Sequence, residues 1–168
     1  GLVAVDSAVR LELPPASSPA HLDRLFRELE TIEPQSTTGM AQGLHMLAER
    51  LPRRSMVFLI SDLWTEPAEL SRALQHLRYR RHQGIVIHLL DEAEVQLSYD
   101  RQVTLQDLET GEKLQVDPAD IRDAYKEQVQ TYLTGIRKVC SDCDMEYHPL
   151  YVQQPYDRAL VSLIHRRT

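Results

Sequence analysis

Residues 55–63, SMVFLISDL, decide the fold class of this chain, because five apolar residues in succession are followed directly by Ser61 and Asp62. The run from Met56 to Ile60 is too short for a free-standing helix and is typical of a strand that is buried on both faces. Such strands belong to parallel sheets, and in open α/β sheets ligands bind beyond the carboxyl ends of the strands. Asp62 is therefore the first candidate site residue. The alternative interpretation is that its carboxylate only caps the loop that leads to the next helix.

The remaining chain alternates strand and helix patterns. This predicts an α/β fold of the three-layer sandwich type, with a mostly parallel sheet and helices on both faces. Met56–Ile60 and Ile85–Leu90 are expected as adjacent, parallel, central strands, because both are apolar runs joined by one helical crossover. The predicted strands cover residues 1–6, 9–13, 55–60, 84–90 and 145–152, and the predicted helices cover 19–33, 40–51, 67–77 and 118–136, with a last helix from Pro155.

A turn sequence, Glu109 to Glu112, interrupts this alternation after the second buried strand. Alternating apolar residues flank it on both sides, so residues 101–117 are predicted to form an inserted β-hairpin. Asp91 ends the second buried strand just as Asp62 ends the first. These two carboxylates support one functional hypothesis, a metal-dependent hydrolase or phosphoryl-transfer enzyme, although no nucleophile or substrate clamp accompanies them.

Length and composition predict one domain over residues 1–168, since a chain with 42% hydrophobic content can bury a self-sufficient core at this size. The net charge of −6, from 25 acidic and 19 basic residues, argues against nucleic acid as a partner.

No apolar run approaches the roughly eighteen residues of a membrane span, and no signal-peptide pattern is present. We therefore expect a cytoplasmic protein. Because the chain starts at Gly1 and enters a strand at once, we also expect a piece of a longer protein, whose parent could be membrane-tethered.

Two cysteines, Cys140 and Cys143, form a lone C-x-x-C after the longest predicted helix. A redox pair would sit at the start of a helix, where the dipole lowers the pKa of a thiol, and zinc would need two further ligands. We interpret the pair as reduced structural thiols.

His88 lies within a buried strand and is expected to be a core histidine with a backbone partner. The histidines on helical patterns, which are expected at the surface, are His21, His45, His76 and His82.

Five segments in a fixed order resemble one family. They are VRLELPP at residues 9–15, SSPAHL at 17–22, QSTTG at 35–39, LISDL at 59–63 and DLETGEKLQVD at 107–117. LISDL alone occurs in many α/β folds, whereas the ordered set is much more specific. The set resembles the C-terminal part of the von Willebrand factor A-like domain of the domain-of-unknown-function-58 proteins, and the resemblance covers nearly the whole chain.

The resemblance implies a metal-ion-dependent adhesion site, in which an Asp-x-Ser-x-Ser loop, a threonine and an aspartate hold magnesium or another divalent cation. Thr37, with Thr38 as the alternate, matches the threonine, and Asp62 matches the aspartate. The Asp-x-Ser-x-Ser loop is absent from this sequence and is expected before Gly1, so the chain carries a partial site. We expect magnesium in the full-length protein and none bound by this chain alone, because one carboxylate supports a dehydration-reluctant cation poorly.

The same resemblance implies a gap in the sheet. A strand that precedes Gly1 in the family would lie between the strands at residues 1–6 and 55–60, so we expect an N-terminally truncated von Willebrand A-like domain. Both strands would then expose backbone groups in what should be the centre of the sheet. Direct pairing of the two strands, or a homodimer formed by a second copy of the chain, would close this gap.

As to function, the resemblance implies a non-enzymatic protein–protein interaction module. The family is often encoded with MoxR-type AAA+ ATPases, so such an ATPase or its client is the implied partner. Trp64 follows Asp62 directly and is a candidate partner-binding residue, either as an exposed aromatic anchor or as a lid over the site loop. Packing of Trp64 into the core is the alternative, and the enzyme hypothesis with Asp62 and Asp91 is the alternative function.

Overall fold

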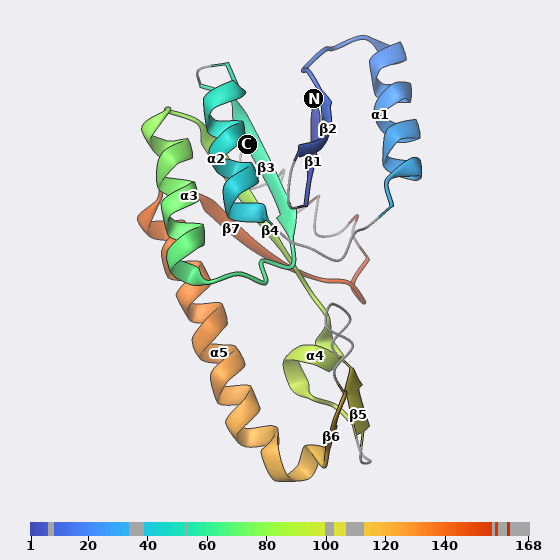
Figure 1. Cartoon of the computed structure of the whole chain (residues 1–168), viewed down its shortest axis with the longest axis vertical. Helices are drawn as coiled ribbons and strands as arrows, with labels where there is room; N and C mark the ends of the chain where they lie inside the picture. The colour runs from blue at the N-terminus through green and yellow to red at the C-terminus, as the bar shows by residue number, and fades with distance from the viewer. Residues whose placement is uncertain are drawn as a thin grey trace.

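The computed structural model describes residues 1–6, 9–33, 39–52, 54–99, 103–106, 113–155, 157 and 161. These residues form a mixed α/β fold (Figure 1). In chain order the elements are β1 (Leu2–Val5), β2 (Val9–Leu13), α1 (Pro19–Thr31), α2 (Met40–Arg50), β3 (Met56–Ser61), α3 (Pro67–Tyr79), β4 (Gln83–Leu90), α4 (Glu92–Gln96), β5 (Val103–Gln106), β6 (Lys113–Val116), α5 (Pro118–Asp142) and β7 (Glu146–Tyr151).

Local side-chain chemistry sets where the helices begin. The Ser18 hydroxyl accepts a hydrogen bond from the His21 N–H at 3.2 Å ahead of α1, and the Asp117 carboxylate accepts one from the Ala119 N–H at 3.0 Å ahead of α5. A proline follows each cap at the start of the helix. Proline is suited to this position because its missing N–H would have no partner there anyway. These starts agree with the predicted helices.

The parallel sheet has the order β3-β4-β7. Phe58 lies opposite Ile85 and Ile60 opposite Ile87, so the predicted adjacency and parallel direction of the two apolar runs are confirmed. The sequence predicts both as central strands, and this is correct only for β4. In the described part of the chain β3 pairs only with β4, so it lies at one edge of the sheet, and β4 lies in the middle between β3 and β7.

The hydrophobic core lies on one face of this sheet. Val57 of β3 and Val86 of β4 meet buried side chains of three helices, among them Leu44 of α2, Leu74 of α3 and Ile136 of α5. These helices cover the first face, and a smaller buried cluster on the second face contains Ile85 and Ile87. Helices on both faces remain a prediction, since most of the helix expected from Pro155 lies outside the described residues.

The second face of β3 is exposed, which corrects the prediction that this run is buried on both faces. Side chains alternate along a strand, so Val57 turns toward the helices while Phe58 and Ile60 turn to the opposite side. Phe58 is 53% exposed and Ile60 is 61% exposed. A continuous apolar run predicts a strand well, but burial of both faces also needs a second covering layer over the edge strand, which the described elements do not supply.

The hairpin of β1 and β2 is attached to α2 rather than to the parallel sheet. The Gly39 N–H donates to the backbone oxygen of Asp6 at 2.7 Å. A β-carbon on Gly43 would lie 2.1 Å from a methyl group of Val5, so glycine permits this close approach of α2 to β1. The expected possibility that the strands at residues 1–6 and 55–60 pair directly is wrong for the described residues, because β1 and β3 belong to different sheets.

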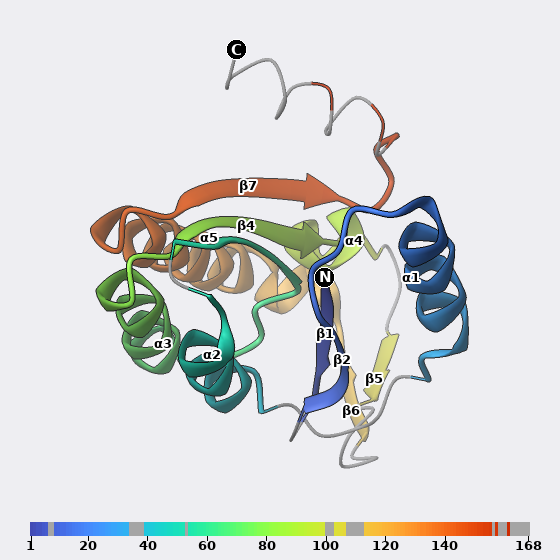
Figure 2. The same ribbon diagram turned by 90° about the horizontal axis from the view of Figure 1, so that it is seen from above.

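Helix α1 carries an apolar face that no described element buries. It stands apart from α3 and α5 in both views of the chain (Figures 1 and 2). Leu22, Phe26 and Leu29 lie on consecutive turns and are each more than half exposed, at 51%, 55% and 52%. This helix and the outer face of β3 both carry large apolar side chains that are exposed.

Strands β5 and β6 pair in antiparallel fashion within residues 101–117. The helix α4 separates them from β4, and this helix is not evident from the sequence because it is only five residues long. Among the described helices, none is both long enough and apolar enough to cross a membrane.

Candidate functional site

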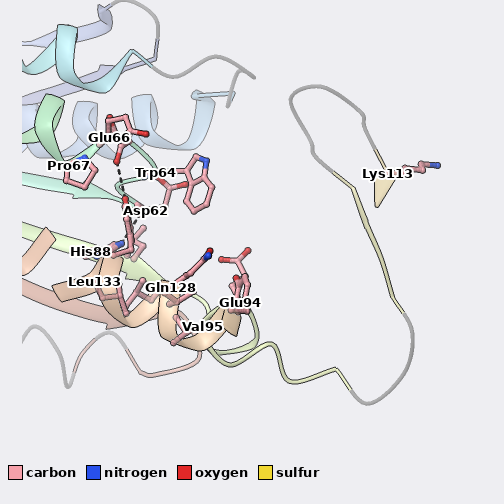
Figure 3. Close-up of a pocket in the computed structure, with 16 residues that line it drawn as sticks. Asp62, Trp64, Glu66, Pro67, His88, Glu94, Val95, Lys113, Gln128 and Leu133 are labelled. Atoms are coloured by element: carbon pink, nitrogen blue, oxygen red, sulfur yellow. Dashed lines mark hydrogen bonds between the residues drawn. The ribbon is translucent and has the colours of Figure 1, made fainter. Parts of the chain in front are cut away.

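A cleft of about 1390 Å³ lies beyond the carboxyl ends of β3 and β4, the position at which open α/β sheets bind ligands. The loop after β3, helix α4 and helix α5 form its walls. Figure 3 shows the Trp64 ring and the Glu94 carboxylate among the side chains that line it. Its lining combines three carboxylates, Asp62, Glu66 and Glu94, with three aromatic rings, Trp64, Tyr125 and Tyr132.

Asp62 lies at the mouth of this cleft with its side chain exposed. Its Oδ1 accepts hydrogen bonds from the Trp64 N–H and from the Ser61 hydroxyl, each at 3.3 Å. The carboxylate therefore does cap its own loop, as the alternative interpretation requires. It also lines the cleft, so the two interpretations of Asp62 are compatible.

Leu63 anchors the loop that carries Asp62 and Trp64. Its side chain is fully buried, and its backbone has a φ of 55°, in the left-handed region that is costly for a branched residue. The Leu63 N–H donates to the Ser61 hydroxyl at 3.0 Å. Its carbonyl oxygen accepts from the Tyr132 hydroxyl of α5. Burial of Leu63 between two exposed neighbours turns the Asp62 and Trp64 side chains toward solvent.

His88, on the neighbouring strand β4, also supports this loop. Its Nε2 lies 2.8 Å from the backbone oxygen of Asp62, and its Nδ1 lies 2.8 Å from the Tyr147 hydroxyl. A carbonyl only accepts, so Nε2 carries the proton, and Nδ1 accepts from Tyr147. Burial raises the pKa of Tyr147 to about 12, which keeps this hydroxyl a donor. The prediction of a core histidine with a backbone partner is confirmed.

Trp64 is 81% exposed, so its packing into the core is excluded. Its ring centroid lies 6.2 Å from that of Tyr132, at an interplanar angle of 51°. Burial raises the pKa of Tyr132, whose hydroxyl serves the loop backbone rather than the cleft. Trp64 and Tyr132 thus form an aromatic pair at the cleft wall, of which only the Trp64 ring is largely open to solvent.

Two of the predicted metal ligands, Thr37 and its alternate Thr38, lie outside the described residues. Asp62 is the remaining predicted ligand. Within the described ranges, no three His, Cys, Asp or Glu side chains converge as metal ligands. The donor set around Asp62 is therefore a single carboxylate with the neighbouring Ser61 hydroxyl, which is too small by itself to hold magnesium firmly.

Asp91 does not join Asp62 at the cleft. Its carboxylate accepts a hydrogen bond from the Ala93 N–H at 2.7 Å and caps helix α4. Because α4 has no apolar periodicity long enough to be recognised, the sequence shows Asp91 only as a strand-end carboxylate. The cleft residues that sequence reasoning missed are Glu66, Glu94 and Tyr132. Glu66 ends the same loop as Asp62, but Glu94 of α4 and Tyr132 of α5 come from elements distant in the sequence, and the three carry no common motif.

The cysteines lie away from the cleft. Cys140 and Cys143 are free thiols and both are fully buried at the end of α5. Burial raises the pKa of Cys140 to about 12, with the neighbouring Cys143 adding to the effect, and burial also raises the pKa of Cys143. These are properties of structural thiols rather than of reactive ones.

One histidine expected at the surface is buried. His82 is 5% exposed, accepts the Ser55 N–H on Nδ1 at 3.2 Å and lies 3.3 Å from the backbone oxygen of Ala48 through Nε2. The expectation of a surface position is wrong because His82 follows the last turn of α3, where the chain bends back between α2 and β3.

The sequence profile of the family described as "Protein of unknown function DUF58" matches residues 1–133 of the chain. Two relatives, "Uncharacterized protein Mb1516" of Mycobacterium bovis and "Uncharacterized protein Rv1480" of Mycobacterium tuberculosis, are each 26% identical over 149 residues. The match covers 85% of this chain and 46% of each relative, so the chain spans about half the length of the curated relatives it matches. No solved structure matches the chain significantly.

Proposed function

The chain belongs to the DUF58 family, and on that premise we propose that it is a protein-interaction module whose binding site is the cleft at the carboxyl ends of β3 and β4. The observation that carries the proposal is Trp64, a large aromatic side chain that is 81% exposed at the cleft wall. Exposed tryptophans of this kind are the residues on which the binding energy of protein interfaces is concentrated.

The rigidity of the loop supports this proposal. Leu63 is buried, and Tyr132 and His88 hold the loop backbone from two different elements. A loop held in one conformation loses little entropy when a partner binds, so more of the contact energy contributes to affinity. The Trp64 ring is therefore presented on a preorganised support.

We further propose that the domain is von Willebrand A-like and that Asp62 belongs to a metal-ion-dependent adhesion site. Asp62 suits that role, because it is an exposed carboxylate at the end of a parallel strand. The described donor set does not by itself fit a magnesium ion, since it offers one carboxylate. We propose that Thr37 or Thr38 and a segment of the longer parent protein supply the remaining ligands.

We propose a MoxR-type AAA+ ATPase, or a client of such an ATPase, as the partner. The alternative of a hydrolase or phosphoryl-transfer enzyme with Asp62 and Asp91 has no specific observation in its favour. Asp91 is engaged as the cap of α4 and does not line the cleft.

The test is a binding titration with the purified MoxR-type ATPase of the same organism, measured by biolayer interferometry with and without magnesium. We expect Trp64→Ala to weaken binding at least tenfold, because it removes the aromatic side chain that the partner would cover. Tyr79→Ala is the matched control, because Tyr79 is an equally exposed aromatic residue, at 83%, on α3 outside the cleft lining. Equal effects of the two substitutions, or no binding in either condition, would refute the proposal. Binding that needs Trp64 but ignores both magnesium and Asp62→Ala would refute only its adhesion-site part.

A further inference from the structure

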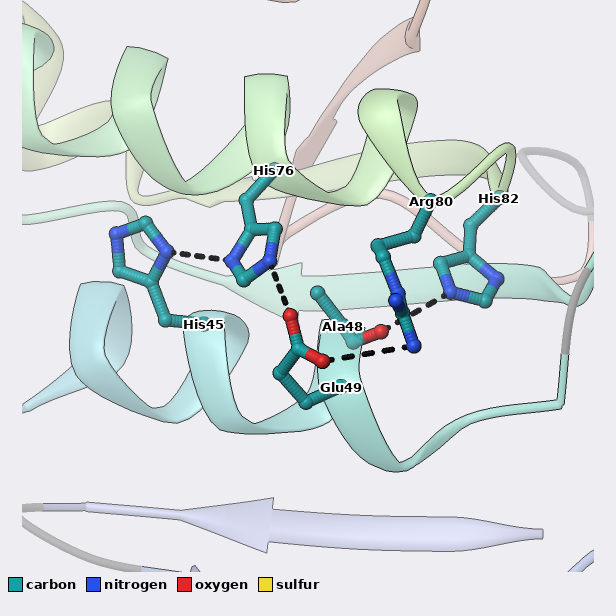
Figure 4. Close-up of polar contacts among 6 residues, drawn as sticks. All are labelled: His45, Ala48, Glu49, His76, Arg80 and His82. Atoms are coloured by element: carbon teal, nitrogen blue, oxygen red, sulfur yellow. Dashed lines mark hydrogen bonds and ion pairs between the residues drawn. The ribbon is translucent and has the colours of Figure 1, made fainter.

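Two histidines face each other across the packed helices α2 and α3. The Nδ1 atoms of His45 and His76 lie 3.0 Å apart, with the ring centroids 5.2 Å apart and the planes tilted by 42° (Figure 4). The Nε2 of His76 lies 2.7 Å from Glu49, whose other carboxylate oxygen is 3.4 Å from Arg80. This cluster is separate from the cleft, since none of its residues lines it.

The hydrogen bonds determine which ring nitrogens carry protons. A carboxylate accepts only, so the Nε2 of His76 donates to Glu49. In neutral His76 the Nδ1 then has a lone pair, and that lone pair is held toward His45. A single proton occupies the space between the two Nδ1 atoms. A metal ion can take the place of this proton once the rings turn so that both lone pairs meet at the ion, and the ion then brings its own positive charge next to the Glu49 carboxylate.

The spacing of the two nitrogens suits a particular class of metal ion. With metal–nitrogen bonds of about 2.1 Å, nitrogens 3.0 Å apart subtend an angle of about 90° at the metal. This is the angle between neighbouring ligands in the square-planar or octahedral geometry of Cu²⁺ and Ni²⁺ rather than the wider tetrahedral angle of Zn²⁺. Imidazole is also a favoured ligand of both ions.

Glu49 is placed as such a site would require. Histidines that bind metals generally donate their second ring N–H to a carboxylate, which orients the ring and makes the ligand nitrogen more basic. Glu49 does this for His76, and it lies one helical turn after His45 on α2. The helices that carry the pair are fixed by their buried contacts, among them Leu44 and Ala73. The two nitrogens are therefore held close together before any ion arrives.

We propose that His45 and His76 form a two-imidazole site for Ni²⁺ or Cu²⁺, with Glu49 as the positioning carboxylate and water as the remaining ligands. The His76 side chain is 26% exposed and Glu49 is 56% exposed, so water reaches the pair. The site uses two protein ligands, His45 and His76. On binding, His45 carries its ring proton on Nε2 instead of Nδ1, so no proton is released, the atoms balance without a further reactant, and the complex gains the charge of the metal ion.

The test is calorimetric titration of the chain with NiCl₂ and separately with CuCl₂ at pH 7.5 in a buffer that does not chelate metals. We expect one ion per chain, and at least tenfold weaker binding in His45→Ala and in His76→Ala. Glu49→Gln should weaken binding about tenfold while both ligands remain. His148→Ala is the control, because His148 lies on β7 beside Glu146 and away from the pair, and its affinity should match the original chain.

A second measurement keeps the test independent of how well the variants fold. Paramagnetic Ni²⁺ added to the unaltered chain should broaden the ring resonances of His45 and His76 before those of His21 or His148. Broadening that begins elsewhere, or an affinity that His45→Ala leaves unchanged, would mean that the pair is a proton-sharing hydrogen bond only, and the proposal would be wrong.

Discussion

The Nε2 of His88 lies 2.8 Å from the backbone oxygen of Asp62, which joins the middle strand of the sheet to the loop that carries the candidate site. The bond spans 26 residues of sequence, and the His88 ring that donates it is almost fully buried. The same ring accepts from the Tyr147 hydroxyl through Nδ1, and only the neutral imidazole can make that contact. Protonation of His88 therefore costs a buried contact of the residue that supports the Asp62 loop.

This coupling predicts a pH dependence of folding. Burial lowers the pKa of His88 below 6.5, partly offset by the hydrogen bond to the Asp62 backbone and by the Asp62 charge. Below pH 6.5 the unfolded chain binds the proton more readily, so the contribution of His88 to the free energy of unfolding is complete above that pH and declines as the pH falls. For one proton the free energy of unfolding changes by at most about 1.4 kcal/mol per pH unit. Urea titrations at several pH values should show a shallower decline of the free energy of unfolding in His88→Gln than in the original chain.

The close approach of α2 to β1 predicts opposite effects for two glycine substitutions. Gly43→Ala should lower the free energy of unfolding by about 1–3 kcal/mol, because the new methyl group would collide with Val5 and outweigh the helical preference of alanine. Gly135→Ala in α5 has open space around it and should raise that free energy by about 0.5–1 kcal/mol. Urea unfolding of both variants checks this. If Gly43→Ala were as stable as Gly135→Ala, the contact between α2 and β1 would be absent.

The buried thiols predict slow modification of the native chain. Cys140 and Cys143 are fully buried, and burial raises the pKa of both thiols. Ellman's reagent should therefore label neither at pH 7.5 until the chain is unfolded in guanidinium, when both should react within minutes. Mass spectrometry after mild oxidation should find no disulfide between them. Fast labelling of the native chain would contradict the structural interpretation.

The small donor set at Asp62 predicts weak magnesium binding by this chain. One carboxylate gives Mg²⁺ little compensation for lost hydration, so isothermal titration should give no saturating signal up to about 1 mM ion. A longer protein that includes an Asp-x-Ser-x-Ser loop should bind at least tenfold more tightly, and Asp62→Ala should abolish that gain. Tight, stoichiometric binding by the present chain would show that residues outside the described ranges complete the site.

The exposed outer face of β3 predicts self-association. Phe58 and Ile60 expose more than half of their side chains at the edge of the sheet, where a second copy can add apolar contact. Sedimentation velocity should show the average mass rising toward that of a dimer with concentration, and Ile60→Lys should weaken this association at least tenfold. Tyr79→Lys, an exposed position on α3, should leave it unchanged. A monomer at every concentration would contradict the prediction.

Sequence patterns by themselves determined the elements that depend on local chemistry. The apolar run Met56–Ile60, the cap at Ser18 and the cap at Asp117 each act within a few residues, so their outcome is readable without a fold. The adjacency of β3 and β4 was also predictable, because one helical crossover leaves two parallel strands few other arrangements. Asp62 could be singled out for the same reason, as the first polar carboxylate after a buried strand.

Only the tertiary structure decided what these elements face. Whether β3 is buried on both faces depends on a covering layer, and the apolar run is the same in either case. The cleft forms where Trp64 meets Tyr132, and the histidine pair forms where His45 meets His76; these contacts join residues of different elements. Periodicity along the chain predicts whether a residue lies on the buried or the exposed face of its own helix or strand. It carries no information about which side chain of another helix or strand will lie opposite, because that is set by the packing of the whole core.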